Sequence, residues 1–317
     1  MNMPINSLIQ KYDYLKSPLN YTGGKYKLLS QIIPLFPSSF DTFIDLFTGG
    51  CNVAININAN NIVANDINPK IIELYNYFKN RKLEKIENEI ESIIKKYNLS
   101  NSSFYGYEYY NTNSKLGLSN YNKEKYLRLR EEYNKNPNPI MFYTLIIYAF
   151  NNQIRFNKKG EFNLPVNKRD FTQNMRKNLK LFVQRIQKKN ISFVAKDFND
   201  IDIPNNSFVY VDPPYLATIA SYNENRGWTE EHEYKLLKYL DKLDNRGIKF
   251  ALSNVLENKG VKNNILLKWC QSDKYRVHCI DNSYSNCSYQ TKNRDKDSTE
   301  EVLITNYKPS INVLTSL

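Results

Sequence analysis

One pattern near the start of the chain limits the folds open to it: an apolar strand, a glycine loop, a helix, a second apolar strand and an acid. The first strand is expected over 42–47, and the loop and its helix over 48–57. The second strand is expected over 61–66 and ends in Asp66, and Pro69 is placed to start the next helix. This order is typical of a nucleotide-binding βαβ unit, which builds a parallel sheet.

The strand pattern resumes only after a long interruption. Residues 81–180 are mostly helical by pattern, and a β-hairpin is expected over 156–162, where Gly160 supplies the turn. We expect further strands over 191–194, 207–211, 249–253 and 301–305. The sequence therefore predicts an α/β domain that is interrupted by an insertion. Its expected parts are a first catalytic part over 1–76, the insertion over 77–185 and a second catalytic part over 186–317.

The most specific short motif follows the expected strand at 207–211 and consists of Asp212, Pro213, Pro214 and Tyr215. Neither proline has an N–H, so the strand must end there and the carboxylate is presented at its carboxyl end. Ligands of open α/β sheets bind at that edge. The Asp212 carboxylate and the Pro213 carbonyl can each accept one hydrogen of an exocyclic amine, while Tyr215 stacks on a flat base. The alternative is a strand-ending turn with Asp212 as a local cap.

The charge of the chain favours a polyanionic partner. Lys and Arg number 44 against 32 Asp and Glu, a formal net charge of +12. The alternative is a composition bias from an AT-rich genome. The four cysteines and two histidines have neither the spacing of a zinc site nor that of a disulfide scaffold. No apolar run is long enough to cross a membrane. We therefore expect no metal, reduced thiols, no membrane contact and a cytoplasmic location.

The glycine loop favours a nucleoside ligand without a phosphate. It lacks a full G-x-G-x-x-G pattern, and no Walker lysine follows it. Asp66 follows Asp45 by 21 residues, the usual interval to an acid that binds both hydroxyls of a ribose. S-adenosylmethionine fits, because it is an adenosine with a cationic sulfonium and an amino-acid tail. Lys25, at the head of a helix expected over 26–33, is placed to pair with the tail carboxylate; the alternative is a solvated lysine.

Taken in order, the motifs resemble those of the Dam-type DNA adenine methyltransferases, the α-class amino-methyltransferases of restriction–modification systems and phages. The likeness covers nearly the whole chain. Residues 21–25 resemble the family's W-A-G-G-K, residues 45–50 its E-P-F-x-G-x-G, residues 65–68 its A-D-I-N, and residues 212–215 its catalytic motif. Residues 252–254 and 301–303 resemble its later strands, and residues 152–157 and 160–165 its DNA-reading hairpin.

Three positions depart from the family pattern. Tyr21 replaces the usual Trp, and Cys51 stands where the second glycine of the glycine motif is usual. Gln153 stands near the place where members specific for GATC usually carry Leu. The recognition sequence therefore does not follow from the resemblance.

The resemblance implies a Rossmann-like seven-stranded methyltransferase sheet with an inserted, mainly helical target-recognition domain that carries a β-hairpin. It implies S-adenosylmethionine as cofactor, double-stranded DNA as partner, and methyl transfer to the N6 amine of a flipped adenine, with a location at the nucleoid through DNA. A cognate restriction endonuclease that acts separately is a further expected partner. The catalytic residues are then Asp212, Pro213, Pro214 and Tyr215. The expected cofactor-binding residues are Tyr21, Lys25, Asp45, Phe47, Gly49, Asn52, Asp66, Ile67, Asp197, Phe198 and Asp212.

The expected DNA contacts lie in the insertion. Arg155 is the candidate for a guanine contact, and Phe150 and Asn151 are candidates to fill or open the base stack. Asp197 and Phe198 are expected to flank the cofactor adenine, unless they form an ordinary strand-end loop. Each basic residue can equally be a solvated surface charge. The expected DNA-binding residues are Phe150, Asn151, Gln153, Arg155, Asn157, Lys158, Lys159, Pro165, Lys168 and Arg169, with the lysines and Arg169 on phosphates.

Three other classes of protein stay open at this stage. One is a methyltransferase that acts on RNA or on a protein glutamine, although the glutamine enzymes typically carry Asn in place of Asp212. A second is a nicotinamide-dependent oxidoreductase, which leaves the Pro-Pro turn unexplained. A third is a DNA-binding protein on an inactive methyltransferase fold, against which Lys25, Asp66 and Asp212 are all present.

Overall fold

The strands of the described part of the chain form a single mixed sheet. The computed structural model describes residues 14–219, 227–280 and 299–309. Within them the strand order is β3-β2-β1-β4-β5-β8-β7, and the short β6 pairs with the end of β5. Strands β1 to β5 run parallel to one another, whereas β8 is antiparallel to both β5 and β7, and β6 is antiparallel to β5. The bounds are β1 Thr42–Asp45, β2 Asn61–Asn65, β3 Ile191–Val194, β4 Ser207–Val211, β5 Lys249–Asn258, β6 Val261–Lys262, β7 Arg276–Cys279 and β8 Thr299–Thr305.

This seven-stranded mixed path is typical of methyltransferases and confirms the expected α/β sheet. All six expected strands are present, with β5 five residues longer than expected, since it ends at 258 rather than 253. Strands β6 and β7 were not expected from the sequence. Strand β7 lies at the edge of the sheet, and its residues are exposed or half-buried, so it lacks the apolar run that marks the central strands.

The prediction of a helix after the glycine loop is wrong. In its place is a single 3-10 turn, η4 Ala54–Asn56. Side-chain amides compete with the helix here: Asn56 Nδ2 donates to the Asn52 carbonyl at 2.7 Å, and Asn56 Oδ1 accepts from the Leu15 N–H at 2.8 Å. The helix expected over 26–33 is likewise divided into η2 Lys25–Leu28, α1 Leu29–Ile32 and η3 Ile33–Leu35.

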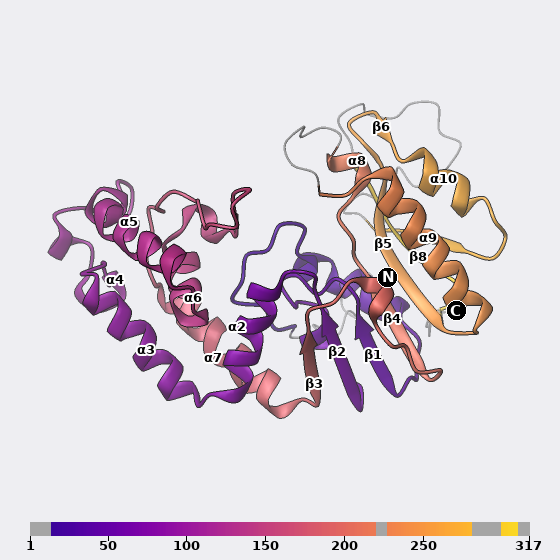
Figure 1. The fold of residues 1–317 in the computed structure, drawn as a ribbon, viewed down its shortest axis with the longest axis horizontal. Helices are drawn as coiled ribbons and strands as arrows, with labels where there is room; N and C mark the ends of the chain where they lie inside the picture. Colours follow the sequence, from indigo (N-terminus) through magenta and orange to yellow (C-terminus); the bar gives the residue numbers. More distant parts are fainter. Residues whose placement is uncertain (1–13, 220–226, 281–298, 310–317) are drawn as a thin grey trace, which may run out of the picture.

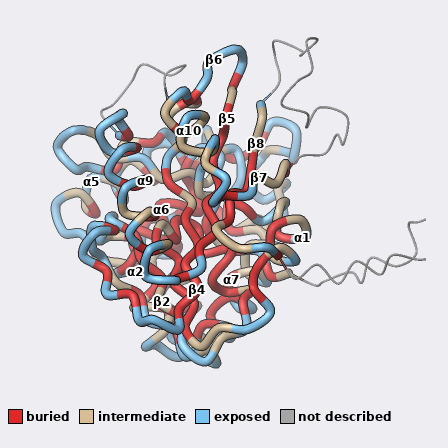
Figure 2. Tube along the Cα trace, turned by 90° about the vertical axis from the view of Figure 1, so that its right-hand side faces the viewer, coloured by how far each residue is buried: buried red, intermediate tan, exposed pale blue. Residues whose placement is uncertain are grey.

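Alternation along the strands gives the sheet two apolar faces. In β1, Phe43 points to one face and Ile44 to the other; in β4, Phe208 and Val209 do the same. The first face is covered by α2 Pro69–Asn80 and α7 Gln173–Lys188, and the second by α9 Glu230–Asn245 and α10 Asn264–Cys270. Figure 2 shows that buried residues concentrate along the strands and the helices next to them, while the outer turns are exposed.

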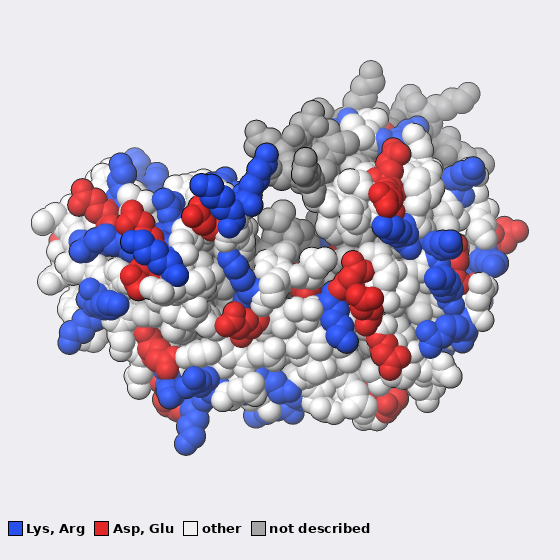
Figure 3. Space-filling model, viewed as in Figure 1, with Lys and Arg blue, Asp and Glu red and all other residues white. Residues whose placement is uncertain are grey.

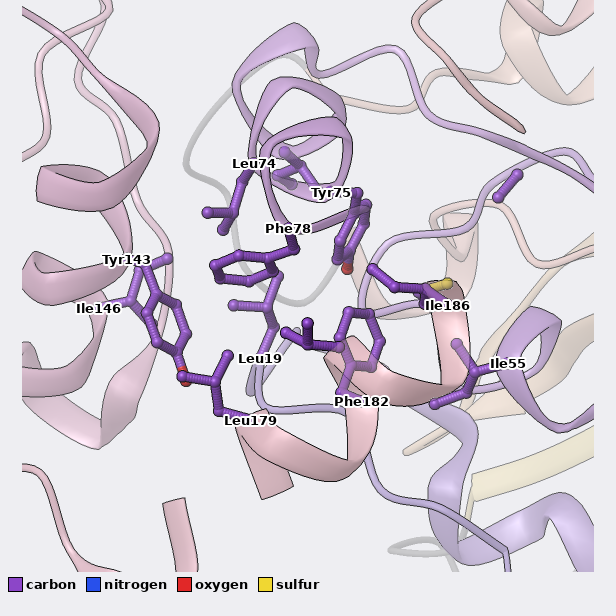
Figure 4. Close-up of a cluster of buried hydrophobic side chains, with 14 of the residues drawn as sticks. Leu19, Ile55, Leu74, Tyr75, Phe78, Tyr143, Ile146, Leu179, Phe182 and Ile186 are labelled. Carbon is purple, nitrogen blue, oxygen red and sulfur yellow. The ribbon is translucent and has the colours of Figure 1, made fainter. Parts of the chain in front are cut away.

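Side-chain caps determine where helices α2 and α7 begin. Asn68 caps α2 by accepting from the Lys70 N–H, and Pro69 occupies its first turn as expected. Thr172 caps α7, whose buried residues recur at 179, 182, 183 and 186, the spacing of one helix face. That face packs on α2 beneath the sheet. Figure 4 shows Phe182 against Tyr75, with ring centroids 5.7 Å apart.

The helices between β2 and β3 share the core of the sheet. Helices α3 Leu83–Lys96, α4 Ser102–Tyr105, α5 Ser119–Lys135 and α6 Pro139–Tyr148 lie beyond α2 and α7, on the side away from the strands (Figure 1). Helix α6 is buried from Met141 to Tyr148, as expected for this apolar stretch. Its Tyr143 meets Phe78 of α2 edge-on at 5.1 Å (Figure 4). Helix α2 therefore links the helical insertion and the sheet through one continuous apolar cluster.

The segment expected as a hairpin folds back on itself without forming a continuous ladder. Single antiparallel bridges join Phe156 to Phe162 and Ala149 to Val166. Gly160 takes the turn with φ +75°, as expected from the sequence. Asn157 closes the turn, because its Oδ1 accepts from the N–H groups of residues 159 and 161 and its own N–H donates to the carbonyl of residue 161.

Among residues 14–219, 227–280 and 299–309, no helix has the length and apolar character needed to span a membrane. The same residues contain no group of three or more His, Cys, Asp or Glu side chains arranged to hold a metal ion.

Candidate functional site

The carboxyl ends of β1, β2 and β4 open into a cavity of about 540 Å³. Topology explains its place, because these parallel strands lie side by side and their loops meet at one edge of the sheet. Every residue expected to be catalytic or cofactor-binding lines this cavity. They are Tyr21, Lys25, Asp45, Phe47, Gly49, Asn52, Asp66, Ile67, Asp197, Phe198, Asp212, Pro213, Pro214 and Tyr215.

The glycine loop brings backbone close to this cavity. Gly49 has φ +43°, and a Cβ there would lie 2.9 Å from the Tyr21 ring. Tyr75 fixes the loop from below, since its hydroxyl donates to the Gly49 carbonyl at 2.6 Å. Cys51, which departs from the family's glycine, is buried with φ +59°. A side chain in this conformation costs about 1–2 kcal/mol, so the local fold keeps the loop shape that glycine would give.

Asp66, at the end of β2, is held by two backbone donors. Its Oδ2 accepts from the Gly49 N–H at 2.9 Å and its Oδ1 from the Asn68 N–H at 2.9 Å. Burial raises the pKa of Asp66, and these two hydrogen bonds oppose the rise. Each carboxylate oxygen keeps a second lone pair, so the group can accept two hydroxyls side by side. Ile67 next to it is 71% exposed and offers an apolar surface to a ring.

Asp45, at the end of β1, lies deeper. Its Oδ2 accepts from the Thr48 hydroxyl at 3.1 Å, whereas its Oδ1 is buried without a hydrogen-bond partner among the described residues. Burial, followed by the charge of Asp212, raises the pKa of Asp45 to about 8. A buried carboxyl with an unused oxygen favours a ligand that brings a positive charge.

Asp212, at the end of β4, lies in a cluster with three other polar groups. Lys25 Nζ lies 3.0 Å from Asp212 Oδ1 and 3.6 Å from Glu301 Oε1. The Tyr215 hydroxyl donates to Asp212 Oδ1 at 2.7 Å and lies 3.3 Å from Glu301 Oε1. Burial raises the pKa of Asp212 and of Glu301, and the Lys25 ammonium opposes the rise in both.

An aromatic wall closes the other side of the cavity. Phe47 lies 5.6 Å from Phe198 and 5.8 Å, edge-on, from Trp228. The Trp228 indole N–H donates to Glu233 at 2.5 Å, which fixes the ring. Asp197 lines the cavity as expected, yet its Oδ1 also caps the local turn by accepting from the residue 199 N–H at 2.9 Å.

Sequence reasoning missed Glu301 and Trp228 as site residues. Glu301 was seen only as the start of a strand, although an acid at the head of an otherwise apolar strand is a signal that could have been used. Trp228 is one of two tryptophans and directly precedes a helix cap at Thr229, which is also a readable signal. Lys25 lies in the expected site, but its ammonium faces Asp212 rather than the open part of the cavity.

The residues expected to contact DNA lie together on residues 150–169 of the insertion. The exposed ones are Phe150, Asn151, Arg155, Lys158, Lys159, Pro165, Lys168 and Arg169; Gln153 and Asn157 are half-buried. Arg155 is held in place, because its Nε donates to Asn163 Oδ1 at 2.8 Å. Figure 3 shows Lys and Arg side chains along the edge of the helical part that borders the hollow next to the sheet. Asn157 is engaged within its turn, so it is the weakest of the expected contacts.

Comparison with known proteins places this geometry in a family. Residues 21–286 match the family model for the D12 class N6 adenine-specific DNA methyltransferase. The chain belongs to this family. That confirms the family expected from the motifs, and with it the family's cofactor, S-adenosylmethionine. The residues present fit this cofactor, since two backbone N–H groups hold the Asp66 carboxylate at the cavity, and the buried Asp45 carboxyl, whose Oδ1 has no hydrogen-bond partner among the described residues, suits a cation.

Several members of the family are similar to the chain over most of its length. It is 45% identical over 303 residues to the Type II methyltransferase M.FokI of Planomicrobium okeanokoites, with 93% of the chain and 43% of that protein covered. It is 41% identical over 319 residues to the Modification methylase StsI of Streptococcus sanguinis, with 97% and 46% covered. The chain thus spans less than half the length of these two relatives. The DNA adenine methylase of Escherichia coli (strain K12) is 26% identical over 304 residues, with 92% of the chain and 95% of that protein covered.

Proposed function

We propose that the chain transfers a methyl group from S-adenosylmethionine to the exocyclic N6 amine of an adenine that is flipped out of duplex DNA. The observation that carries the proposal is the position of Asp212–Tyr215. This motif ends β4 inside the cavity and faces the same space as the Asp66 carboxylate of β2. A site for a nucleoside and a site for an amine are therefore adjacent.

Cofactor binding is assigned to the rim of β1 and β2. Asp66 accepts the two ribose hydroxyls, because its orientation is fixed by two backbone N–H groups. Ile67 and the Phe198 side of the aromatic wall flank the adenine ring, while Tyr21 shapes the glycine loop. Asp45 takes the positive charge of the amino-acid end. Phe47, Gly49, Asn52 and Asp197 complete the lining.

Catalysis is assigned to the end of β4. The adenine amine is a poor nucleophile, since its lone pair is delocalised into the ring. Asp212 and the Pro213 carbonyl accept its two hydrogens and direct the lone pair toward the methyl carbon, while Pro214 keeps the turn rigid and Tyr215 stacks on the base. When bound, the cofactor supplies an electrophilic methyl group on sulfur. Most of the rate then comes from positioning and oriented dipoles.

DNA recognition is assigned to the insertion. We propose that residues 77–185 form the target-recognition domain and that 1–76 and 186–317 form the catalytic domain. The folded-back segment from Ala149 to Val166 takes the place of the expected hairpin. Arg155, oriented by Asn163, reads a guanine edge, and the exposed basic residues contact phosphates. Adenine must leave the stack before its amine can reach Asp212.

Partners follow from the same assignment. Duplex DNA is the proposed substrate, and the net charge of +12 suits a polyanion. A cognate restriction endonuclease that acts separately is a further proposed partner. RNA as the substrate is the alternative in the same class, and an inactive DNA-binding protein is the alternative in another.

The test follows the transfer of a radioactive methyl group from the cofactor to a nucleic acid. The chain is incubated with S-adenosylmethionine that carries a tritiated methyl group and with duplex DNA or folded RNA of mixed sequence. We expect label in duplex DNA that is recovered as N6-methyladenine after digestion to nucleosides. Label confined to RNA, or DNA binding without any label, would favour one of the two alternatives. Long-read detection of modified adenines in the product then gives the recognition sequence.

A further inference from the structure

Two carboxylates compete for one ammonium beside the proposed target amine. Lys25 makes the shorter contact with Asp212 and the longer one with Glu301, and the Tyr215 hydroxyl lies between the same two acids. The Lys25 side chain is only 4% exposed, against 17% for Asp212 and 26% for Glu301. These four groups form one sheltered cluster, which we call the two-acid cluster.

The observed arrangement conflicts with the proposed role of Asp212. Asp212 Oδ1 already faces an ammonium at 3.0 Å and a hydroxyl at 2.7 Å. An incoming amine also presents hydrogens, so it would meet two donors at Oδ1, and at Oδ2 it would approach a carboxylate whose charge the ammonium already neutralises. An ammonium beside Asp212 also weakens the attraction of its carboxylate for an amine that becomes positive as the new bond forms. Lys25 therefore has to leave Asp212 before transfer.

We propose that Glu301 is a positioning residue that takes over the Lys25 ammonium when the target amine binds to Asp212. This inference rests on the proposed function. Glu301 is suited to the role because it already lies 3.6 Å from Lys25 Nζ, so a small rotation completes the ion pair. A buried ammonium without a counter-charge is strongly unfavourable, and Glu301 prevents that state.

The scaffold determines which group moves. Glu301 belongs to β8 and pairs with Val255 of β5, and the next four residues of β8 are buried. Asp212 directly follows β4 and is held by the two prolines. Lys25 has a flexible four-carbon stem, and its Nζ also donates to the Gly23 carbonyl at 2.7 Å. The ammonium is therefore the mobile member between two fixed acids.

The charge of the two-acid cluster supports the same exchange. With both acids ionised, two negative charges face one positive charge. After the exchange, Lys25 and Glu301 neutralise each other and Asp212 keeps its full charge for the amine. The amine nitrogen gains positive charge as it bonds to the methyl carbon. The carbon–sulfur bond breaks at the same time, and its electron pair goes to sulfur. The nitrogen then loses one proton to solvent. Stabilisation that appears only in this step raises turnover rather than binding.

The test is a double-mutant cycle on turnover. We expect Glu301→Gln to lower the single-turnover rate of adenine methylation about tenfold or more, with the affinity for S-adenosylmethionine and for DNA that lacks the target amine changed less than about twofold. In a Lys25→Met background, saturated with cofactor, there is no ammonium to remove. The same Glu301→Gln change should then alter the rate less than about twofold. Glu300→Gln is the matched control, because its side chain leaves β8 on the opposite face.

Equal loss in both backgrounds would overturn the proposal, because Glu301 would then act without Lys25. A Glu301→Gln rate within twofold of the wild type would overturn it as well. The wild-type rate is measured first on the same DNA. Absence of any transfer by the wild type contradicts the proposed function instead, so the two failures are distinguishable.

A binding measurement covers the case in which Lys25→Met is too slow to compare. The probes are two duplexes that carry adenine or purine, which lacks the amine, at the target position, in the presence of S-adenosylhomocysteine. We expect Glu301→Gln to weaken binding of the adenine duplex about tenfold relative to the purine duplex, when each is compared with the wild type. An equal change for both duplexes would contradict the proposal, since a general structural defect does not sense the amine.

Discussion

The rim of the sheet and the DNA-facing segment of the insertion are built in opposite ways. At the rim, Asp45, Asp66 and Asp212 are largely or fully buried and lie at the carboxyl ends of three adjacent strands. In the insertion, the residues assigned to DNA are mostly exposed and lie on irregular backbone, with Asn151 and Asn152 both at positive φ. Chemistry is thus assigned to a rigid, sheltered edge, and recognition to a surface that can change without disturbing the core.

Two residues, Asn20 and Lys70, nevertheless tie these regions together. Asn20, next to the glycine loop, donates to the Asn151 carbonyl at 2.7 Å. Lys70, in the first turn of α2, donates to the Gly160 carbonyl at 2.6 Å and lies 4.1 Å from the Phe156 ring centroid. The recognition segment is therefore anchored to the two loops that surround the proposed cofactor. This makes the contrast testable, because changes at the rim should affect chemistry and changes in the segment should affect sequence choice.

The largest expected effect is the loss of methyl transfer when Asp212 is replaced. Asp212→Ala should abolish methyl transfer, to below a tenth of the wild-type rate, while DNA and cofactor binding stay within roughly tenfold, about 1.4 kcal/mol. The reason is that its carboxylate contacts the reacting amine, which matters most in the transition state. Single-turnover rates and equilibrium titrations measure both quantities. The control is Asp202→Ala, which removes an exposed acid ahead of the same strand. An Asp212→Ala rate above a tenth of the wild-type rate would refute the catalytic assignment.

The next effect separates the role of Asp66 from that of Asp212. Asp66→Ala should weaken S-adenosylmethionine binding, because two hydrogen bonds to a charged group are lost, each worth roughly 1.5–3 kcal/mol. DNA affinity should change much less. Calorimetry with the cofactor checks this. Unchanged cofactor affinity would remove the ribose role, and tight NADH binding in the same assay would support the oxidoreductase instead.

The rim was predictable from the sequence because local patterns determine it. A strand followed by Asp-Pro-Pro-Tyr or by a glycine loop places its polar residue at the sheet edge whatever the rest of the chain does. Glu301 was not predictable in this way. It reaches Asp212 only because β8 pairs with β5 and β5 pairs with β4, a consequence of long-range topology. The direction of the Lys25 side chain has the same origin, since its partners lie 187 and 276 residues away in the chain.

The insertion was predictable as helical but not in its recognition segment. A continuous apolar run after the Asn138 cap marks α6 in the sequence, and amphipathic spacing after the Thr172 cap marks α7. After α6, asparagine side chains bind backbone groups locally: Asn152 Nδ2 donates to the carbonyl of residue 147 in the last turn of that helix, and Asn157 closes the turn. Such bonds depend on the final geometry, so a hairpin pattern alone overestimates the regular pairing.

A smaller effect tests the recognition side. If Arg155 reads a guanine, Arg155→Ala should lose about 1–3 kcal/mol of discrimination at one base pair. Lys158→Ala should instead weaken binding to all sequences alike and reduce the salt slope by about one. Both changes remove one positive charge from neighbouring exposed positions. Methylation rates on single-base variants of the target, at two salt concentrations, distinguish them. An equal fall on every variant would make Arg155 a phosphate contact.

The smallest expected effect is on the free energy of unfolding of the protein without ligands. It follows from the pKa of Asp45, which is raised to about 8. An unfolded Asp has a pKa near 3.9, so between these values the folded chain binds a proton that the unfolded chain does not. Stability should therefore fall as pH rises through this window. Between pH 5.5 and 8, the wild type should lose at least about 1.4 kcal/mol more than Asp45→Asn, the equivalent of one pKa unit.

Urea unfolding at the two pH values, without cofactor, measures this difference. Asp41→Asn is the matched control at the opposite end of β1, because hydrogen bonds from Asn60 and Asn61 lower the pKa of Asp41 and it stays ionised across the whole range. Saturating S-adenosylmethionine should flatten the pH dependence of the wild type, since a bound cation favours the ionised form of Asp45. Parallel stability curves for the wild type and Asp45→Asn would mean that Asp45 is ionised in the free protein, and that its unused oxygen is solvated rather than reserved for the ligand.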